Sequence, residues 1–202
     1  MSLATICRTL SLQEYLAREE VAEDKHEYRD GIVLEMPVKS TRHCVISGNI
    51  LGNLCQALRR TDWQPWISGQ RYAMDAKRVH TYADVGVSPR EYCVHAFDPG
   101  AITNPHTLFE VLSPTTESYN RGLKFEFYRS LPSLQEYILV AQNRPAVDRF
   151  VRQANGQWLL FDYHGLDATI PLPGIGCELR LADIYEGVEF GEEEKISGGD
   201  EN

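Results

Sequence analysis

The stretch TLFEVLSP, residues Thr107–Pro114, combines a run of strand-forming apolar residues with one carboxylate. Leucine, phenylalanine and valine favour a pleated, covered environment, so we expect a short buried strand that ends at Pro114. Glu110 lies in the middle of this run. Because a carboxylate is expensive to desolvate, it stays buried only beside a cation, a hydrogen-bond network or a metal. The stretch therefore predicts a core strand and, on it, a candidate functional site.

A second acid lies in a similar setting upstream. Asp84 belongs to the segment YADVGV, and we expect one strand from Thr81 to Val87 around it. If this strand neighbours the one around Glu110, the two carboxylates can converge on a metal ion. Mg²⁺ binds hard oxygen ligands and can activate water for attack on a phosphodiester. A single strand acid is more often paired with an arginine or exposed to solvent, and that alternative stays open.

The bulk composition is typical of a soluble globular protein. The chain has 202 residues, of which 43% are hydrophobic and 24% charged, and this length favours one domain. No apolar run is long enough to span a bilayer and the N-terminus has no signal-peptide core, so we expect a cytoplasmic protein without membrane contact. The five cysteines are scattered, without zinc-binding spacing, which predicts reduced structural thiols.

The net charge of -9 is unevenly distributed along the chain. Seven acids and one lysine lie between Glu186 and the C-terminus. We therefore expect a single domain over residues 1–190, followed by an acidic, disordered tail at 191–202. The remaining body is close to balanced in charge. It can hold a local basic groove, although no strong nucleic-acid footprint is present.

Periodicity and capping signals predict alternating helices and strands. A capping box at Ser11–Glu14 begins a helix that ends near Glu20, and a second helix runs from Ser40 to about Arg60 with an apolar stripe at every fourth residue. Strands are expected around Glu110 and at 32–36, 66–74, 81–87, 136–141, 146–152, 157–163 and 168–172, with a loop at 88–106. This order predicts a mixed α/β domain in which helices flank a central sheet.

A third helix follows the strand around Glu110 and carries a candidate lysine. Residues typical of helix caps and first turns come directly after this strand, and the helix is expected to end near Ser130. We expect Leu123 and Phe127 to face the core. Lys124 would lie one residue from that face, where it could position a water or offset phosphate charge. A solvated helix lysine is the alternative, and the pattern alone favours it.

Other polar residues have competing interpretations. His43, on the second helix, could approach a phosphate or a water, although a lone helix histidine is more often satisfied or exposed. Arg71 could contact phosphate, but a salt bridge to a neighbouring acid is the interpretation we favour. Ser113 lacks a G-x-S-x-G elbow, which argues against a serine hydrolase. The chain also has no Walker A loop and no dinucleotide fingerprint.

In combination, the motifs resemble the Uma family of restriction endonucleases, within the PD-(D/E)XK nuclease superfamily. The resemblance extends from about residue 9 to about residue 190. The motifs that carry it are KHEYRDG at 25–31, DVGV at 84–87, EVLSPTTE at 110–117, RGLKFEFYR at 121–129 and PSLQEY at 132–137. It implies a restriction-endonuclease-like core, with a central mixed β-sheet flanked by helices and additional antiparallel strands. The proline that usually precedes the first acid is replaced by Ala83.

The resemblance also implies the site and the reaction. Asp84 and Glu110 would bind Mg²⁺, or Mn²⁺, for hydrolysis of DNA phosphodiester bonds by a homodimer. The superfamily usually has a lysine two residues after the second acid, where this chain has Leu112. The catalytic lysine would then come from the following helix, as Lys124. Glu27 resembles an additional carboxylate that the first helix brings to the metal in some members, with a surface acid as the alternative.

A second function class fits part of the sequence. A non-catalytic binding or assembly protein that retains the nuclease fold would explain the acidic balance, the missing lysine at Leu112 and the absence of a DNA-binding appendage. Divalent metal binding that depends on Asp84 would separate the two classes.

Overall fold

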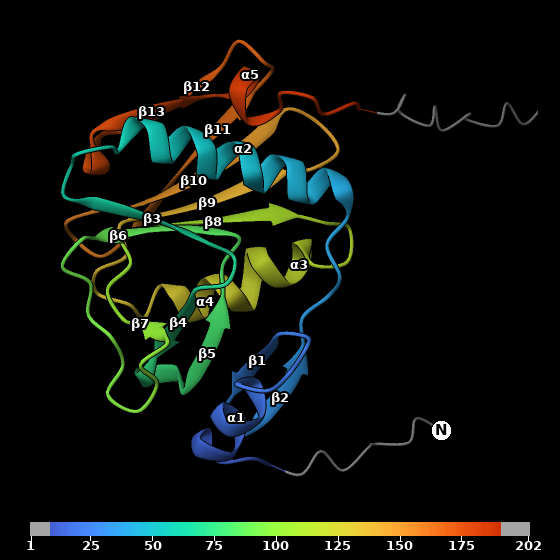
Figure 1. Ribbon diagram of the computed structural model, residues 1–202. Helices are drawn as coiled ribbons and strands as arrows, with labels where there is room; N and C mark the ends of the chain where they lie inside the picture. Colours follow the sequence, from blue (N-terminus) through green and yellow to red (C-terminus); the bar gives the residue numbers. More distant parts are fainter. Residues whose placement is uncertain (1–8, 191–202) are drawn as a thin grey trace, which may run out of the picture.

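The computed structural model describes residues 9–190, and the predicted tail at 191–202 lies outside the described residues (Figure 1). The helices are α1 (Leu12–Glu19), α2 (Thr41–Ala57), α3 (Glu117–Tyr119), α4 (Phe125–Tyr128) and α5 (Leu181–Ile184), with a π-helical turn at Asn120–Lys124 between α3 and α4. The strands are β1 (His26–Arg29), β2 (Ile32–Glu35), β3 (Trp63–Ile67), β4 (Arg71–Met74), β5 (Val79–Tyr82), β6 (Val85–Pro89), β7 (Ala101–Ile102), β8 (Thr107–Leu112), β9 (Glu136–Ala141), β10 (Ala146–Arg152), β11 (Trp158–His164), β12 (Thr169–Leu172) and β13 (Cys177–Arg180).

The strands form two larger sheets and a hairpin. The six-stranded sheet has the order β11-β10-β9-β8-β6-β3, the five-stranded sheet has the order β2-β1-β5-β4-β7, and β12 pairs with β13. In the six-stranded sheet β8 and β9 are parallel, whereas the other neighbours are antiparallel, so the predicted mixed sheet is confirmed. The predicted strand around Glu110 is β8, and it lies between β6 and β9 in the interior of this sheet.

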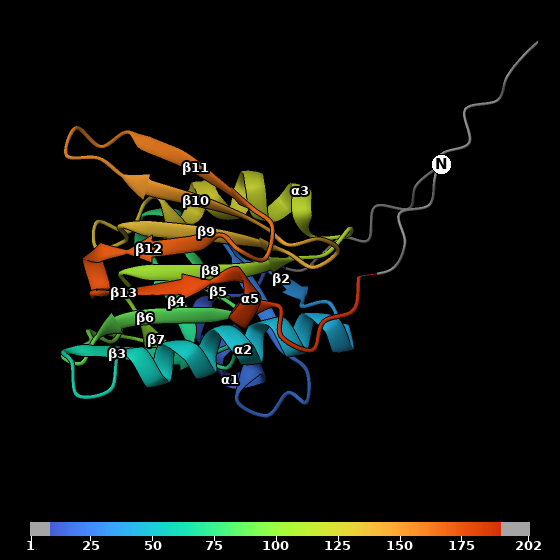
Figure 2. The same ribbon diagram turned by 90° about the horizontal axis from the view of Figure 1, so that it is seen from above.

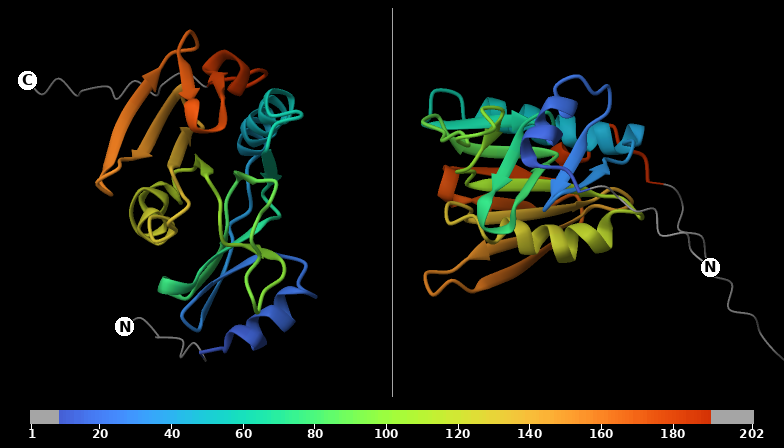
Figure 3. Two further views of the ribbon diagram at one scale, coloured as in Figure 1. Left: turned by 90° about the vertical axis from the view of Figure 1, so that its left-hand side faces the viewer. Right: turned by 90° about the horizontal axis from the view of Figure 1, so that it is seen from below.

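Helices cover both faces of the six-stranded sheet. On one face lie α2, α5 and the β12–β13 hairpin, while α3 and α4 lie on the other, between the two larger sheets (Figures 1 and 3). Seen from above, α2 runs along the sheet close to β3 and β6 (Figure 2). The apolar stripe predicted for α2 is buried in this layer, at Ile46, Ile50, Leu54 and Leu58.

Alternation along β8 divides its side chains between two hydrophobic cores. Phe109 and Val111 belong to the core under α2, whereas Leu108 and Leu112 belong to the core around α4. Successive side chains of a strand point to opposite faces, so Glu110 shares the face of Leu108 and Leu112. The carboxylate therefore points toward the layer that contains α3 and α4.

Local capping signals in the sequence are confirmed. The Ser11 side chain caps α1, and Glu14 accepts from the Ser11 backbone N–H at 2.8 Å, which completes the capping box. The Ser40 side chain caps α2 by accepting the His43 backbone N–H at 3.2 Å. Both helices begin where the sequence predicts because these contacts span only three residues.

The single strand predicted from Thr81 to Val87 is wrong, because the chain bends at Asp84. Its first part is β5, which pairs with β1 and β4 in the five-stranded sheet. Its second part is β6, which pairs with β3 and β8 in the six-stranded sheet. The predicted strand 66–74 is divided in the same way into β3 and β4. Asp84 therefore lies where the chain passes from one sheet to the other, and not inside a strand.

The buried face of the third helix differs from the face predicted from its apolar pattern. The π-helical turn interrupts it, and the buried side chains are those of Asn120, Lys124, Phe125 and Tyr128. Leu123, expected in the core, is 42% exposed. An extra residue in a π turn rotates the following side chains around the axis, so the apolar pattern misplaces the buried face. This rotation brings Lys124 inside.

Three further expectations need correction. Glu27 lies on β1 and not on the first helix. The predicted loop at 88–106 contains β7, and β13 was not expected. Among residues 9–190, no helix combines the length and the apolar character needed to cross a membrane.

Candidate active site

Asp84, Glu110, Lys124 and Glu27, the four predicted site residues, line one cavity of about 200 Å³. The cavity lies where the bend after β5, the centre of β8, the π-helical turn, β1 and the start of α2 come together. Other polar side chains that line it include those of Lys39, His43, Ser113, Thr116, Tyr119 and Gln142. The structure thus brings together acids that are 83 positions apart at the extremes, from Glu27 to Glu110.

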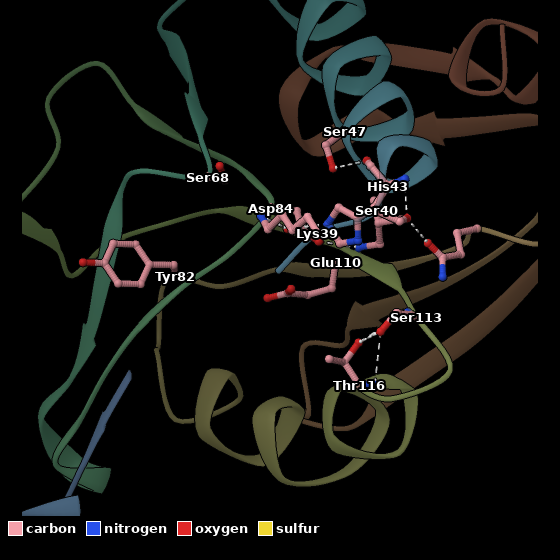
Figure 4. A network of polar contacts seen from close by, with 12 residues as sticks. Lys39, Ser40, His43, Ser47, Ser68, Tyr82, Asp84, Glu110, Ser113 and Thr116 are labelled. Atoms are coloured by element: carbon pink, nitrogen blue, oxygen red, sulfur yellow. Dashed lines mark hydrogen bonds and ion pairs between the residues drawn. The ribbon is translucent and has the colours of Figure 1, made fainter. Parts of the chain in front are cut away.

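Asp84 is fixed against β8 by its own side chain. Its Oδ2 accepts the backbone N–H of Val111 at 2.7 Å, and its backbone N–H donates to the Phe109 carbonyl at 3.2 Å. The bend thus continues the pairing of β6 with β8. The other oxygen, Oδ1, contacts two basic side chains, Lys39 and His43, which Figure 4 shows beside it.

The two basic contacts of Asp84 differ in geometry. The Lys39 ammonium donates a hydrogen bond to Oδ1. His43 Nε2 lies 2.9 Å from the same oxygen but without the alignment of a hydrogen bond. Burial alone would raise the pKa of Asp84, but His43 and Lys39 outweigh it and hold this pKa well below its usual range. Asp84 is therefore an anion at neutral pH.

Glu110 and Lys124 form a buried ion pair. Lys124 Nζ lies 2.7 Å from Glu110 Oε1 and donates to the Tyr82 carbonyl at 2.9 Å. The Tyr128 hydroxyl donates to the same Glu110 oxygen at 3.0 Å. Both charged side chains are nearly inaccessible, 3% exposed for Lys124 and 4% for Glu110. The solvated lysine that the helix pattern favoured is therefore wrong, because the π-helical turn directs Lys124 inward.

The pKa of Glu110 is shifted in the opposite direction to that of Asp84. The pKa of Glu110 is raised to about 7, because the effects of burial and of the nearby Asp84 exceed the lowering effect of Lys124. A carboxyl with a pKa near neutrality can exchange a proton when the charge in the cavity changes.

Glu27 forms a third part of the cavity wall. Its Oε1 accepts from the Tyr119 hydroxyl at 2.6 Å and is paired with Arg29, and its Oε2 accepts from the Thr81 hydroxyl at 2.5 Å. The side chain is 1% exposed, which rules out the alternative of a surface acid. These donors occupy both oxygens of Glu27, whereas the contacts of Glu110 with Lys124 and Tyr128 both fall on Oε1.

The donor set of the cavity fits a hard divalent cation that retains part of its water. Mg²⁺ usually binds through one or two carboxylates, with water and phosphate at the other positions. Within residues 9–190, no group of three or more His, Cys, Asp or Glu side chains is arranged to hold a metal. Asp84 and Glu110, on the bend after β5 and on β8, both line the cavity and are the two carboxylates that would hold such an ion. The raised pKa of Glu110 agrees with this fit, because a bound cation would stabilise its ionised form.

The contacts of His43 and Lys39 with Asp84 were not predicted from the sequence. His43 was interpreted as a satisfied or exposed helix residue, although its position three residues after the cap Ser40 places it on the first turn of α2. Lys39 had no sequence signal, since it lies in the connection between β2 and α2. Arg71 behaves as favoured: it forms an ion pair with Asp98 at 2.7 Å and lies outside the cavity.

The sheet order and the helices on both faces define a protein with a restriction-endonuclease-like fold. Agreement with a solved structure supports this class: a crystal structure described as "a putative nuclease belonging to DUF820", from Anabaena variabilis ATCC 29413, matches with a TM-score of 0.69. The match covers 87% of this chain and 97% of that one, at 16% identity. The chain belongs to the Uma2 family, whose model carries the description "Putative restriction endonuclease" and matches residues 12–182.

Two relatives from Synechocystis sp. are similar over most of their length. The protein slr1290 is 36% identical over 183 residues, which is 90% of this chain and 94% of that protein. The protein sll1609 is 30% identical over 170 residues, or 84% of this chain and 96% of that protein. The predicted family resemblance is confirmed by the family model over residues 12–182.

Proposed function

We propose that this protein is a divalent-metal-dependent endonuclease that hydrolyses phosphodiester bonds in DNA. The observation that carries the proposal is the pair of buried acids, Asp84 and Glu110, which line one cavity together with the Lys124 ammonium. Membership of a family described as restriction endonucleases supports the same reaction class.

Each side chain has a distinct part in the proposed reaction. Asp84 and Glu110 would hold Mg²⁺, or Mn²⁺, through carboxylate oxygens. When bound, such an ion supplies Lewis-acid activation of water and stabilises charge on the phosphate. Lys124 is fixed by Glu110 and the Tyr82 carbonyl, so its ammonium has one position from which to orient a water. Tyr128 holds Glu110 in place from α4.

The test of this proposal is cleavage of plasmid, single-stranded and branched DNA with Mg²⁺ or Mn²⁺. Asp84→Asn, Glu110→Gln and Lys124→Met should each lower the cleavage rate by orders of magnitude, whereas Lys77→Met should not. Lys77 is a suitable control because it forms an exposed ion pair with Glu126, away from the cavity. Cleavage that survives all three site substitutions would contradict the proposal.

The rival role makes a different prediction in the same experiment. A binding or assembly protein would neither cleave DNA nor bind Mn²⁺ in a way that depends on Asp84. Calorimetry of the wild type and of Asp84→Asn separates the two roles even if the correct DNA substrate is not among those tried.

We further propose a homodimer, because a two-fold assembly suits cleavage of both strands of a duplex. Light scattering of the purified protein should give twice the chain mass of 23.0 kDa. A monomeric mass at the concentrations used for cleavage would contradict this part of the proposal without affecting the chemistry.

A further inference from the structure

Lys39 differs from Lys124 in how firmly it is held in the cavity. The Lys39 side chain is 31% exposed and extends from the connection between β2 and α2, whereas Lys124 is 3% exposed. Lys124 has two acceptors, Glu110 and the Tyr82 carbonyl. Within the part of the chain that the structure describes, the Lys39 ammonium has a hydrogen bond to Asp84 alone. Lys39 can therefore leave its carboxylate for solvent without breaking another contact.

The contact made by Lys39 is at the oxygen that a metal needs. Asp84 Oδ2 is engaged by the backbone N–H of Val111, so Oδ1 is the oxygen left for a ligand in the cavity. The Lys39 ammonium already lies on Oδ1. Two cations that share one carboxylate oxygen repel each other strongly in a buried site, where screening by water is weak.

We infer that Lys39 occupies the metal position on Asp84, so that the Lys39 ammonium and a divalent ion compete for Asp84 Oδ1. This inference rests on the proposed metal site. In the metal-free protein Lys39 pairs with a carboxylate that is 5% exposed and whose Oδ1 also contacts His43. Metal binding displaces the ammonium into the mouth of the cavity. Lys39 thus lowers metal affinity and stabilises the metal-free state.

His43 contacts the same oxygen but cannot leave as Lys39 can. It lies on the first turn of α2 and is 7% exposed, and its backbone N–H is held by the Ser40 cap. The competition is therefore assigned to Lys39.

Calorimetric titration with Mn²⁺ alone tests the inference on the full chain. Lys39→Met should bind Mn²⁺ about tenfold more tightly than the wild type, since a competing cation is removed. Lys39→Arg retains a cation and should bind like the wild type, and Lys77→Met removes the same charge from an exposed ion pair and should also leave the affinity unchanged. Equal affinity of Lys39→Met and wild type would overturn the inference while the proposed metal site stands.

The same titration distinguishes failure of the metal site from failure of the competition at Asp84. If neither the wild type nor Lys39→Met binds Mn²⁺, the metal site and the competition at Asp84 are both overturned. If the wild type does not bind and Lys39→Met does, the competition is supported in its strongest form.

Thermal unfolding gives a second readout that needs no activity. Without metal, Lys39→Met should have a lower melting temperature than the wild type, because Asp84 loses the ammonium that pairs with it. Adding Mn²⁺ should raise the melting temperature of Lys39→Met more than that of the wild type. In the Asp84→Asn background, Lys39→Met should no longer lower the melting temperature. An Mn²⁺-induced shift no larger than that of the wild type would overturn the inference.

Discussion

Two clusters of buried acids, one around Asp98 and one around Asp84 and Glu110, look alike in burial but differ in their surroundings. Asp98 is 1% exposed and receives two N–H groups of Arg71, at 3.0 and 2.7 Å, with His80 Nδ1 at 2.9 Å. Burial would raise the pKa of Asp98, but His80 and Arg71 hold it well below its usual range. Asp98, Arg71 and His80 contact one another and do not line the cavity.

The cavity cluster is less well compensated. Glu110 has one cation, Lys124, and a nearby second acid, and its pKa is raised to about 7. Asp84 has a mobile partner in Lys39. The comparison teaches that burial of an acid does not by itself mark a functional site. The mark is an acid that borders a cavity and whose charge is not fully balanced by firmly held basic groups, because such a carboxylate can accept a ligand.

The same isosteric change at the two clusters should have opposite consequences, and the largest effect is at Asp84. Asp84→Asn should lower DNA cleavage by about 10³-fold, as expected when a group that stabilises transition-state charge is removed. The free energy of unfolding should fall by less than for the same change at Asp98, because Lys39, one of the two basic partners of Asp84, can return to solvent. Initial rates and urea unfolding measure both. If Asp84→Asn lowered the free energy of unfolding strongly but left the cleavage rate unchanged, the comparison would be reversed.

Asp98→Asn should affect stability and leave the chemistry intact. The free energy of unfolding should fall by about 3 kcal/mol, since Arg71 keeps a half-buried charge without its partner. Mn²⁺ affinity, measured below the melting temperature, should stay at the wild-type value. The matched control is Asp183→Asn, which breaks an exposed pair with Arg180 and should destabilise far less. Loss of Mn²⁺ binding in Asp98→Asn would connect the two clusters.

The pH dependence of stability should differ in sign between Glu110 and Asp98. The pKa of Glu110 is raised in the folded state, so the folded protein binds more protons than the unfolded chain between about pH 4.5 and about pH 7. Metal-free stability should therefore fall across this range, by about 1 kcal/mol for each pH unit, and level off above it. Asp98, with a lowered pKa, loses its contribution only in acid.

Urea unfolding of the wild type and Glu110→Gln between pH 4.5 and pH 8 checks this prediction. The difference in free energy between the two proteins should change with pH in this window and become constant above it. Parallel curves over the whole window would mean that Glu110 is ionised throughout.

The smallest effect is expected from the hydroxyl that supports Glu110. Tyr128→Phe removes the donor at 3.0 Å and should lower stability by about 1 kcal/mol. It should also shift the pH window of the preceding experiment upward, because the ionised Glu110 loses a hydrogen bond. Tyr137→Phe is the matched control: its buried hydroxyl donates to the Asn120 carbonyl at 3.0 Å, so stability should fall without a shift of the window.

Local patterns in the sequence predicted the elements that depend on contacts between near neighbours. The capping box of α1, the cap and stripe of α2, and the bounds of β8 follow from spacings of a few residues. Asp84 and Glu110 were recognisable because each is a charge among apolar residues, and Lys124 came from the family resemblance.

The tertiary structure decided what those residues do together. The bend at Asp84 arises because β5 and β6 pair in different sheets, and the inward position of Lys124 arises from the π-helical turn. The contact between Lys39 and Asp84 joins positions 45 residues apart. Periodicity describes which face of an element is apolar, but it does not specify which distant strand or loop comes to cover it. The acids of the cavity and, through the family resemblance, Lys124 could therefore be predicted from the sequence. The contacts of Lys39 and His43 with Asp84, and the cavity itself, depend on long-range packing.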